Sequence, residues 1–246
     1  MSLPVLYKIH YSPWSEKAKW ALQARGIAHK QVEYLPMIET LWLRARTGRW
    51  TGKLTVPVLI ADGQQVGDSF LIAQWAAVRG QGPELIADGR LAEVAAWNDR
   101  CETVMANGRA LVTPRVAGQP DSALEQIPPA LRWIGPLSAP LVKLGVRYLQ
   151  EKYALDAVGQ DGRREAIRTE LIGLRQALQG GDHLLGSFSF ADIAMAVALQ
   201  VVQPVADQFI KLGPATRRQW RDPILADEFA DVLAWRDRIY AGFRHN

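Results

Sequence analysis

The sequence predicts two domains, a small α/β unit at residues 1–80 and an all-helical domain at residues 91–246. Short runs of β-branched and aromatic residues alternate with helical patterns only in the first eighty residues. A Gly-Gln-Gly-Pro breaker follows at residues 80–83. Beyond it, helical periodicity continues to residue 246 with no convincing strand, so the second domain is expected to be all α.

A strand and a helix open the first unit. Residues 5–11 mix β-branched and aromatic residues with partial alternation, which predicts a strand. The strand ends at Ser12-Pro13, where serine is a favoured N-cap and proline suits the first helical position. The predicted helix then runs to Gly26, a natural C-terminal stop.

The rest of this unit alternates strands and helices. Its further elements are strands at 32–35, 55–60 and 65–66, a helix or loop at 38–46, and a helix at 70–78. The turn signal Asp62-Gly63 joins the last two strands into a hairpin. The predicted order is therefore β-α-β-α-β-β-α.

Periodicity places five helices in the second domain. They are expected at 91–112, 137–154, 161–179, 190–203 and 226–241. Residues 114–140 are rich in proline, so this stretch is interpreted as an irregular excursion between helices.

Composition and charge indicate an ordinary globular protein. Hydrophobic residues make up 48% and charged residues 22% of the 246 residues, which excludes disordered and coiled-coil classes. The net charge of +4 is spread along the chain, so no nucleic-acid partner is expected. The densest basic groups have helical spacing and are interpreted as solvated faces: Arg163, Arg164, Arg168, Arg217, Arg218 and Arg221.

A single cysteine, Cys101, excludes an internal disulfide and a multi-cysteine metal site, so no metal is expected. The first five residues lack the pattern of a secretory signal. The most apolar later run, at residues 193–202, is too short to cross a bilayer. The expected location is therefore cytoplasmic, with no membrane partner.

The segment Ser12-Pro13-Trp14-Ser15 lies at the first strand-to-helix turn. A helix N-terminus carries free N–H groups and a partial positive charge, which favour a thiolate over a thiol. A serine hydroxyl that donates a hydrogen bond to a sulfur would lower the pKa of that thiol further. The alternative interpretation is that Ser12 only caps the helix.

Two more motifs follow in order. Thr55-Val56-Pro57 places a proline at a strand, where a cis peptide bond would set the direction of the backbone. Asp68-Ser69 comes twelve and thirteen residues after Val56, at the start of a predicted helix whose free N–H groups can bind a carboxylate. Taken alone, each motif could also be an edge-strand proline or a simple helix cap.

Together, and in this order, the three motifs resemble those of the cytosolic glutathione transferases, over nearly the whole chain. The resemblance implies a thioredoxin-like glutathione-binding domain followed by the helical domain of that family. In related glutaredoxins and thioredoxins the first turn carries Cys-x-x-Cys, and here both cysteine positions are serine, which favours transferase chemistry over disulfide exchange. The resemblance implies that Ser12 activates the glutathione sulfur, with Tyr11 as the second candidate.

The resemblance also implies how glutathione is bound. The residues expected to contact it are Trp14, Ser15, Lys53, Val56, Pro57, Asp68 and Ser69. The backbone of Val56, before a cis Pro57, would pair with the cysteinyl part. Asp68 and Ser69 would hold the γ-glutamyl end, and Lys53 would face the glycine carboxylate.

A pocket for a small hydrophobic electrophile is expected at the helix that begins the second domain. The residues proposed to line it are Trp97, Arg100, Cys101, Val104 and Met105. Such aromatic and methionine stripes are more often core than substrate site. Cys101 is interpreted as a small buried hydrophobe.

The expected function is therefore that of a glutathione transferase of the kind used in detoxification, with glutathione as co-substrate. The resemblance implies a homodimer. Two alternatives remain open at this point: a non-catalytic binding protein with the same fold, and a glutathione-dependent reductase, against which the two serines argue.

Overall fold

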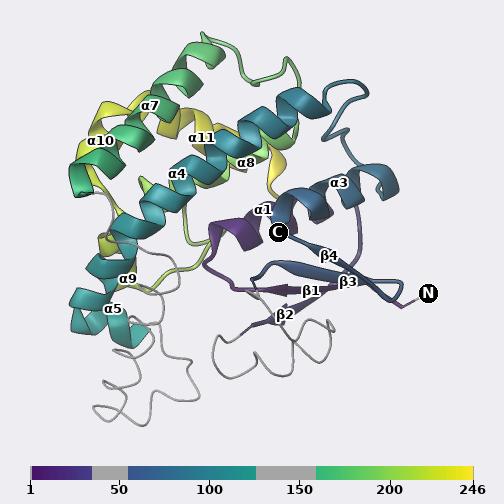
Figure 1. The fold of residues 1–246 in the computed structure, drawn as a ribbon, viewed down its shortest axis with the longest axis horizontal. Helices are drawn as coiled ribbons and strands as arrows, with labels where there is room; N and C mark the ends of the chain where they lie inside the picture. Colours follow the sequence, from purple (N-terminus) through teal and green to yellow (C-terminus); the bar gives the residue numbers. More distant parts are fainter. Residues whose placement is uncertain (1, 35–54, 126–158, 246) are drawn as a thin grey trace. The chain divides into compact units, whose positions relative to one another are not determined.

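The computed structural model describes residues 2–34, 55–125 and 159–245, and Figure 1 shows its fold. Contacts divide the chain into two compact units. The first unit contains residues 1–98, 180–197 and 238–246, and the second contains residues 99–179 and 198–237. The domain limits expected from the sequence, at residues 80 and 91, stay a prediction.

A four-stranded sheet forms the centre of the first unit. Its strands are β1 (Val5–Lys8), β2 (Lys30–Glu33), β3 (Val58–Ala61) and β4 (Gln64–Gly67). Their order across the sheet is β2-β1-β3-β4. Strand β1 runs parallel to β2 and antiparallel to β3, which is antiparallel to β4. This mixed topology is thioredoxin-like, as the sequence predicts.

The hairpin between β3 and β4 confirms the Asp-Gly turn signal. Asp62 has φ 51° and Gly63 has φ 73°. A two-residue hairpin turn of type I′ needs positive φ at both central residues, because only that twist matches the flanking strands.

Two helices cover one face of the sheet, α1 (Pro13–Ala24) and α3 (Ser69–Arg79) (Figure 1). The core between them and the strands consists of Leu6, Ala18, Leu22, Leu59, Ala61, Ile72 and Ala76. Side chains alternate across a strand, so Tyr7 points to the opposite face, where it packs with Tyr34. Gly26, with φ 66°, follows the end of α1 where the sequence predicts the stop.

The other regular elements of the described residues are helices. They are α4 (Leu91–Gly118), α5 (Pro120–Glu125), α7 (Gln160–Leu178), α8 (Phe190–Ala198), the short 3₁₀ helix η2 (Leu199–Val201), α9 (Pro214–Trp220), α10 (Pro223–Glu228) and α11 (Ala230–Phe243). The elements expected at 38–46 and 137–154 lie outside the described residues. None of the described helices is long and apolar enough to span a bilayer.

Several helix boundaries expected from the sequence are wrong. Helix α4 continues through Pro114 to Gly118, because the packing of buried residues such as Leu111 outweighs the missing proline N–H. Helix α5 also occupies part of the stretch expected to be irregular. The single helix expected at 226–241 is broken at Phe229, whose φ of −114° and ψ of 33° separate α10 from α11.

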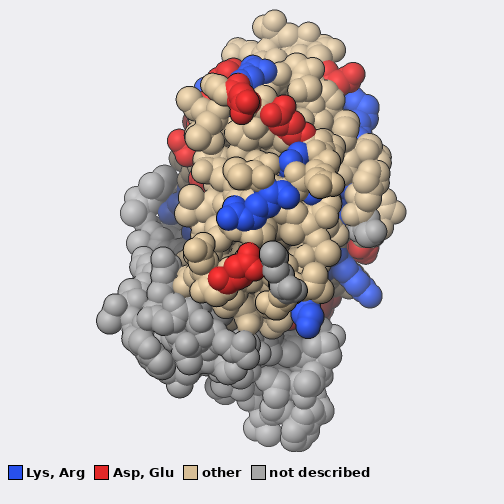
Figure 2. All heavy atoms as spheres, turned by 90° about the vertical axis from the view of Figure 1, so that its right-hand side faces the viewer, with Lys and Arg blue, Asp and Glu red and all other residues tan. Residues whose placement is uncertain are grey.

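Arginines on α7 form ion pairs, which corrects their interpretation as a solvated face. Arg164 Nε lies 3.0 Å from Asp222 Oδ2, and Asp222 is buried. Arg168 Nε lies 2.8 Å from Glu228 Oε2. These pairs join α7 to the segments around α10. On the face drawn in Figure 2, the basic side chains of the described residues lie among acidic ones.

Gly108 on α4 gives a test of packing in the second unit. A Cβ atom at this position would come within 2.2 to 2.8 Å of three side-chain atoms of Val201. We expect Gly108→Ala to lower the free energy of unfolding by about 1–3 kcal/mol, the usual cost of overpacking. Urea unfolding measures this. Gly118→Ala, which meets nothing within 4 Å, is the control, and equal midpoints would contradict the prediction.

Candidate functional site

The register of the sheet brings the three sequence motifs to one edge. Tyr7 of β1 is paired with Val58 of β3, and Val58 is paired with Gly67 of β4. Neighbouring strands lie about 4.8 Å apart, so these three backbones lie within about 10 Å. The segments at 8–12, 56–57 and 68–69 therefore leave the sheet at the same edge.

The peptide bond between Val56 and Pro57 is cis, as the sequence predicts. It comes directly before β3, and the Val56 side chain packs against the Tyr7 and Tyr34 cluster. The backbone of Val56 thus lies beside the end of β1, next to the turn that leads into α1.

Ser12 occupies the N-cap position of α1 without using its side chain as a cap. Its carbonyl accepts the Glu16 N–H at 3.0 Å, and its own N–H donates to the Ile9 carbonyl at 3.1 Å. The half-buried hydroxyl makes no capping hydrogen bond. The turn therefore presents the Ser12 hydroxyl at the positive end of α1, where it can donate to a ligand.

Ser15 supports the same turn from inside. Its side chain is buried, and Oγ accepts the Ile9 N–H at 3.1 Å. The hydroxyl proton of Ser15 is not used in that bond, so its contact with glutathione stays a prediction, as does that of the half-buried Trp14.

Asp68 and Ser69 begin α3. The Asp68 backbone has φ 51°, and its Oδ1 accepts the N–H groups of Phe70 and Leu71, both at 2.8 Å. This is the cap that the sequence predicts. Ser69 is buried at the first helical position of α3.

Glu33 joins this edge, although no sequence motif singles it out. It accepts three hydrogen bonds: from His10 N at 2.7 Å, from His10 Nδ1 at 2.8 Å and from Lys8 Nζ at 3.0 Å. Desolvation acts to raise the pKa of Glu33, but the bonds from His10 and Lys8 outweigh it and lower the pKa to about 2. The signal that could have found it is the pairing of β1 with β2, which sets Lys8 opposite Glu33.

Tyr11, the second candidate for sulfur activation, lies next to Ser12. Burial raises the pKa of Tyr11 to about 12, and the charge of Glu33 adds to the shift. The His10 and Tyr11 rings meet edge to face at 5.0 Å. Tyr11 therefore keeps its proton at neutral pH and can donate a hydrogen bond but cannot accept a proton as a phenolate.

The residues expected to line an electrophile pocket fall in different surroundings. Cys101, Val104 and Met105 are fully buried in the second unit, as core residues are. The Arg100 guanidinium lies 3.0 Å from Glu170, and Trp97 is half-buried. Their role at a pocket stays a prediction. Lys53, expected at the glycine carboxylate, lies outside the described residues.

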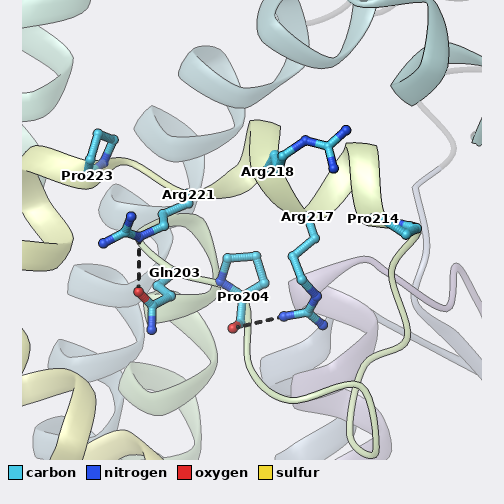
Figure 3. A pocket seen from close by; sticks show the side chains of 7 residues that line it. All are labelled: Gln203, Pro204, Pro214, Arg217, Arg218, Arg221 and Pro223. Atoms are coloured by element: carbon cyan, nitrogen blue, oxygen red, sulfur yellow. Dashed lines mark hydrogen bonds between the residues drawn. The ribbon is translucent and has the colours of Figure 1, made fainter.

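A pocket of about 540 Å³ lies in the second unit, and none of the predicted site residues lines it (Figure 3). Its lining consists of Gln203, Pro204, Pro214, Arg217, Arg218, Arg221 and Pro223. Arg217 donates to the Pro204 carbonyl at 3.3 Å, and Arg221 donates to Gln203 Oε1 at 3.3 Å. These two bonds thus connect residues 203–204 to α9 and to the residue that follows it. Among the described residues, no group of His, Cys, Asp and Glu is arranged to hold a metal.

The sheet, the two helices on its face and the cis proline define a thioredoxin-like class of protein. A family model, "Glutathione S-transferase, N-terminal domain", matches residues 6–84, which contain these elements except Val5, the first residue of β1. Residues 6–84 are therefore a domain of the glutathione S-transferase N-terminal type. A comparison with curated proteins gives no match.

Solved structures share the fold over nearly the whole chain. A glutathione S-transferase from Methylobacillus flagellatus with glutathione bound is 17% identical, with TM-score 0.60, covering 97% of this chain and 95% of its own. One from Methylobacterium radiotolerans, in complex with glutathione sulfonate, is 18% identical, with TM-score 0.61 and coverage of 98% and 92%. The beta-etherase LigF from Sphingobium is 18% identical, with TM-score 0.62 and coverage of 98% and 96%.

Proposed function

We propose that the protein is a glutathione transferase that activates the glutathione thiol for attack on a small hydrophobic electrophile. The observation that carries this proposal is the Ser12 hydroxyl, which makes no capping bond at the N-terminus of α1. It lies on the sheet edge where the cis Val56–Pro57 segment and Ser69 also emerge. Glutathione is the co-substrate, and the proposal includes a homodimer and no metal.

In the proposed reaction the glutathione sulfur lies beside Ser12. The hydroxyl donates a hydrogen bond to the sulfur, and the partial positive charge of α1 favours the thiolate, so the pKa of the thiol falls. The thiolate is the reactive nucleophile. Its electron pair forms a bond to the electrophilic carbon, and the leaving group departs with the pair of the bond that breaks.

The remaining contacts orient the tripeptide. The backbone of Val56 pairs with the cysteinyl part of glutathione, and Pro57 sets the direction of that backbone. Ser69 and the start of α3 receive the γ-glutamyl carboxylate. Asp68 caps the helix through Oδ1, so its other oxygen is the one that faces the ligand ammonium group.

Calorimetric titration with glutathione tests the binding half of this proposal. We expect Ser69→Ala to weaken glutathione binding by about tenfold, because the variant removes a hydrogen bond to a charged carboxylate. Ser187→Ala, at an exposed position of the same unit, is the matched control and should bind as the wild type does. Absence of glutathione binding to the wild type would contradict the proposal. Binding without conjugation of any electrophile would favour the non-catalytic alternative.

A further inference from the structure

His10 is an exposed imidazole held by a carboxylate beside the proposed thiol site. Its side chain is 58% exposed, and its Nδ1 lies 2.8 Å from Glu33 Oε1. The same oxygen accepts a hydrogen bond from the His10 backbone N–H at 2.7 Å, so the Glu33 carboxylate fixes both the ring and the backbone of His10. Lys8 Nζ donates a hydrogen bond to the other oxygen of Glu33 at 3.0 Å.

This hydrogen bond decides which ring nitrogen is basic. An ionised carboxylate can only accept, and Glu33 remains ionised because its pKa is lowered to about 2. In neutral His10 the proton is therefore on Nδ1, and the lone pair is on Nε2, away from Glu33. A carboxylate that orients an imidazole in this way also stabilises the imidazolium that forms when Nε2 takes a proton.

The turn from Ile9 to Ser12 fixes His10 near the proposed sulfur position. The Ser12 N–H donates a hydrogen bond to the Ile9 carbonyl and closes the turn, and the Ile9 N–H donates to Ser15 Oγ. His10 precedes Ser12 by two residues, so their Cα atoms lie at most about 7 Å apart. A general base takes a proton from a group within hydrogen-bond reach or through one water molecule, so the inference requires His10 Nε2 to come that close to the bound sulfur.

We propose that His10 is the catalytic base that takes the thiol proton of glutathione, with Glu33 as its positioning residue. This inference rests on the proposed transferase function and names the proton acceptor that the Ser12 hydroxyl does not provide. The groups that face His10 in the described structure are Glu33 from β2, with Lys8 of β1 behind it, and Tyr11 from the same turn.

The step balances without any further reactant. The S–H bond breaks, its proton binds His10 Nε2, and the sulfur keeps the electron pair that then forms the S–C bond. The leaving group departs with the pair of its own bond to carbon. The imidazolium, paired with Glu33, passes its proton to water, so each turnover releases one proton and one leaving group.

The test measures conjugation of glutathione to chlorodinitrobenzene across the pH range by wild type, His10→Gln, Glu33→Gln and the double variant. We expect His10→Gln to lower kcat/KM on the order of 10²-fold, the low end for a general base, and to leave glutathione binding by calorimetry nearly unchanged. Added imidazole should restore part of the lost rate. The amide introduced by Glu33→Gln keeps an acceptor for the His10 backbone N–H, so this change should add little loss in the His10→Gln background.

His245→Gln is the matched control, since it removes an exposed imidazole that is not on this turn. The inference is overturned if His10→Gln keeps wild-type kcat/KM at every pH while the wild type conjugates glutathione. It is also overturned if that variant loses glutathione binding and imidazole restores nothing, because His10 would then be structural. A wild type that conjugates no electrophile would overturn the proposed function and this inference together.

Discussion

Replacing Ser12 by alanine should lower kcat/KM for glutathione conjugation by about 10²- to 10³-fold, the usual loss when one preorganised donor to a developing anion is removed. The Ser12 hydroxyl makes no capping bond to α1, so the variant does not lose a helix cap. The loss should therefore lie in sulfur activation. Steady-state conjugation measures the rate, and the thiolate absorbance of bound glutathione, followed against pH, measures the acidity of the thiol.

Two companion variants separate Ser12 from its neighbour. Tyr11→Phe removes the competing hydroxyl, and we expect a smaller loss of kcat/KM than for Ser12→Ala. A larger loss would assign sulfur activation to Tyr11. Ser12→Cys should form a mixed disulfide with glutathione, because a thiolate at this helix start can do so and a serine cannot. Mass spectrometry without a glutathione adduct on that variant would argue against the placement of position 12 beside the sulfur.

Local chemistry explains why much of the first unit could be predicted. Pro13 has the fixed φ that suits the first helical position, and Gly26 ends α1 with a positive φ that glycine adopts easily. Asp62-Gly63 fixes the hairpin in the same way, with both residues at positive φ. These signals act over a few residues, so they can be recognised without knowing the partner strand.

The features that could not be predicted depend on contacts between residues far apart in the sequence. The hydrogen bond between His10 and Glu33 requires the parallel pairing of β1 with β2. No local sequence pattern predicts that pairing. Helix α4 passes through Pro114 because buried neighbours hold it, and α10 is separated from α11 at Phe229. In the sequence Glu16 is only one position of the first helix, yet it pairs with a residue 228 positions away.

That pair is Glu16 with Arg244, buried within the first unit. Arg244 Nε lies 2.7 Å from Glu16 Oε1, and each side chain is only 1% exposed. Glu16 Oε2 also forms an ion pair with Lys19 Nζ, at 2.9 Å. The pair lies at the first turn of α1, because the Glu16 N–H donates to the Ser12 carbonyl. The segment around Arg244 thus packs against the helix that carries the candidate site.

Glu16→Met should lower the free energy of unfolding by about 3–5 kcal/mol, the usual cost of leaving one member of a buried ion pair alone. Arg244→Met should cost less, because Lys19 still faces Glu16. Urea unfolding measures both values. Asp227→Asn, which breaks an exposed pair with Arg221, is the control and should shift the midpoint far less.

The double variant with methionine at positions 16 and 244 decides whether charge or packing is responsible. Replacing both members of a buried ion pair by apolar residues of similar volume is often neutral or stabilising, because no charge then remains desolvated. We therefore expect the double variant to be more stable than Glu16→Met alone, with a coupling energy above about 1 kcal/mol. Additive losses would show that the two side chains act independently. In that case α1 would be held to the end of α11 by apolar contacts and by the bond from Trp20 Nε1 to the Phe243 carbonyl, at 3.1 Å.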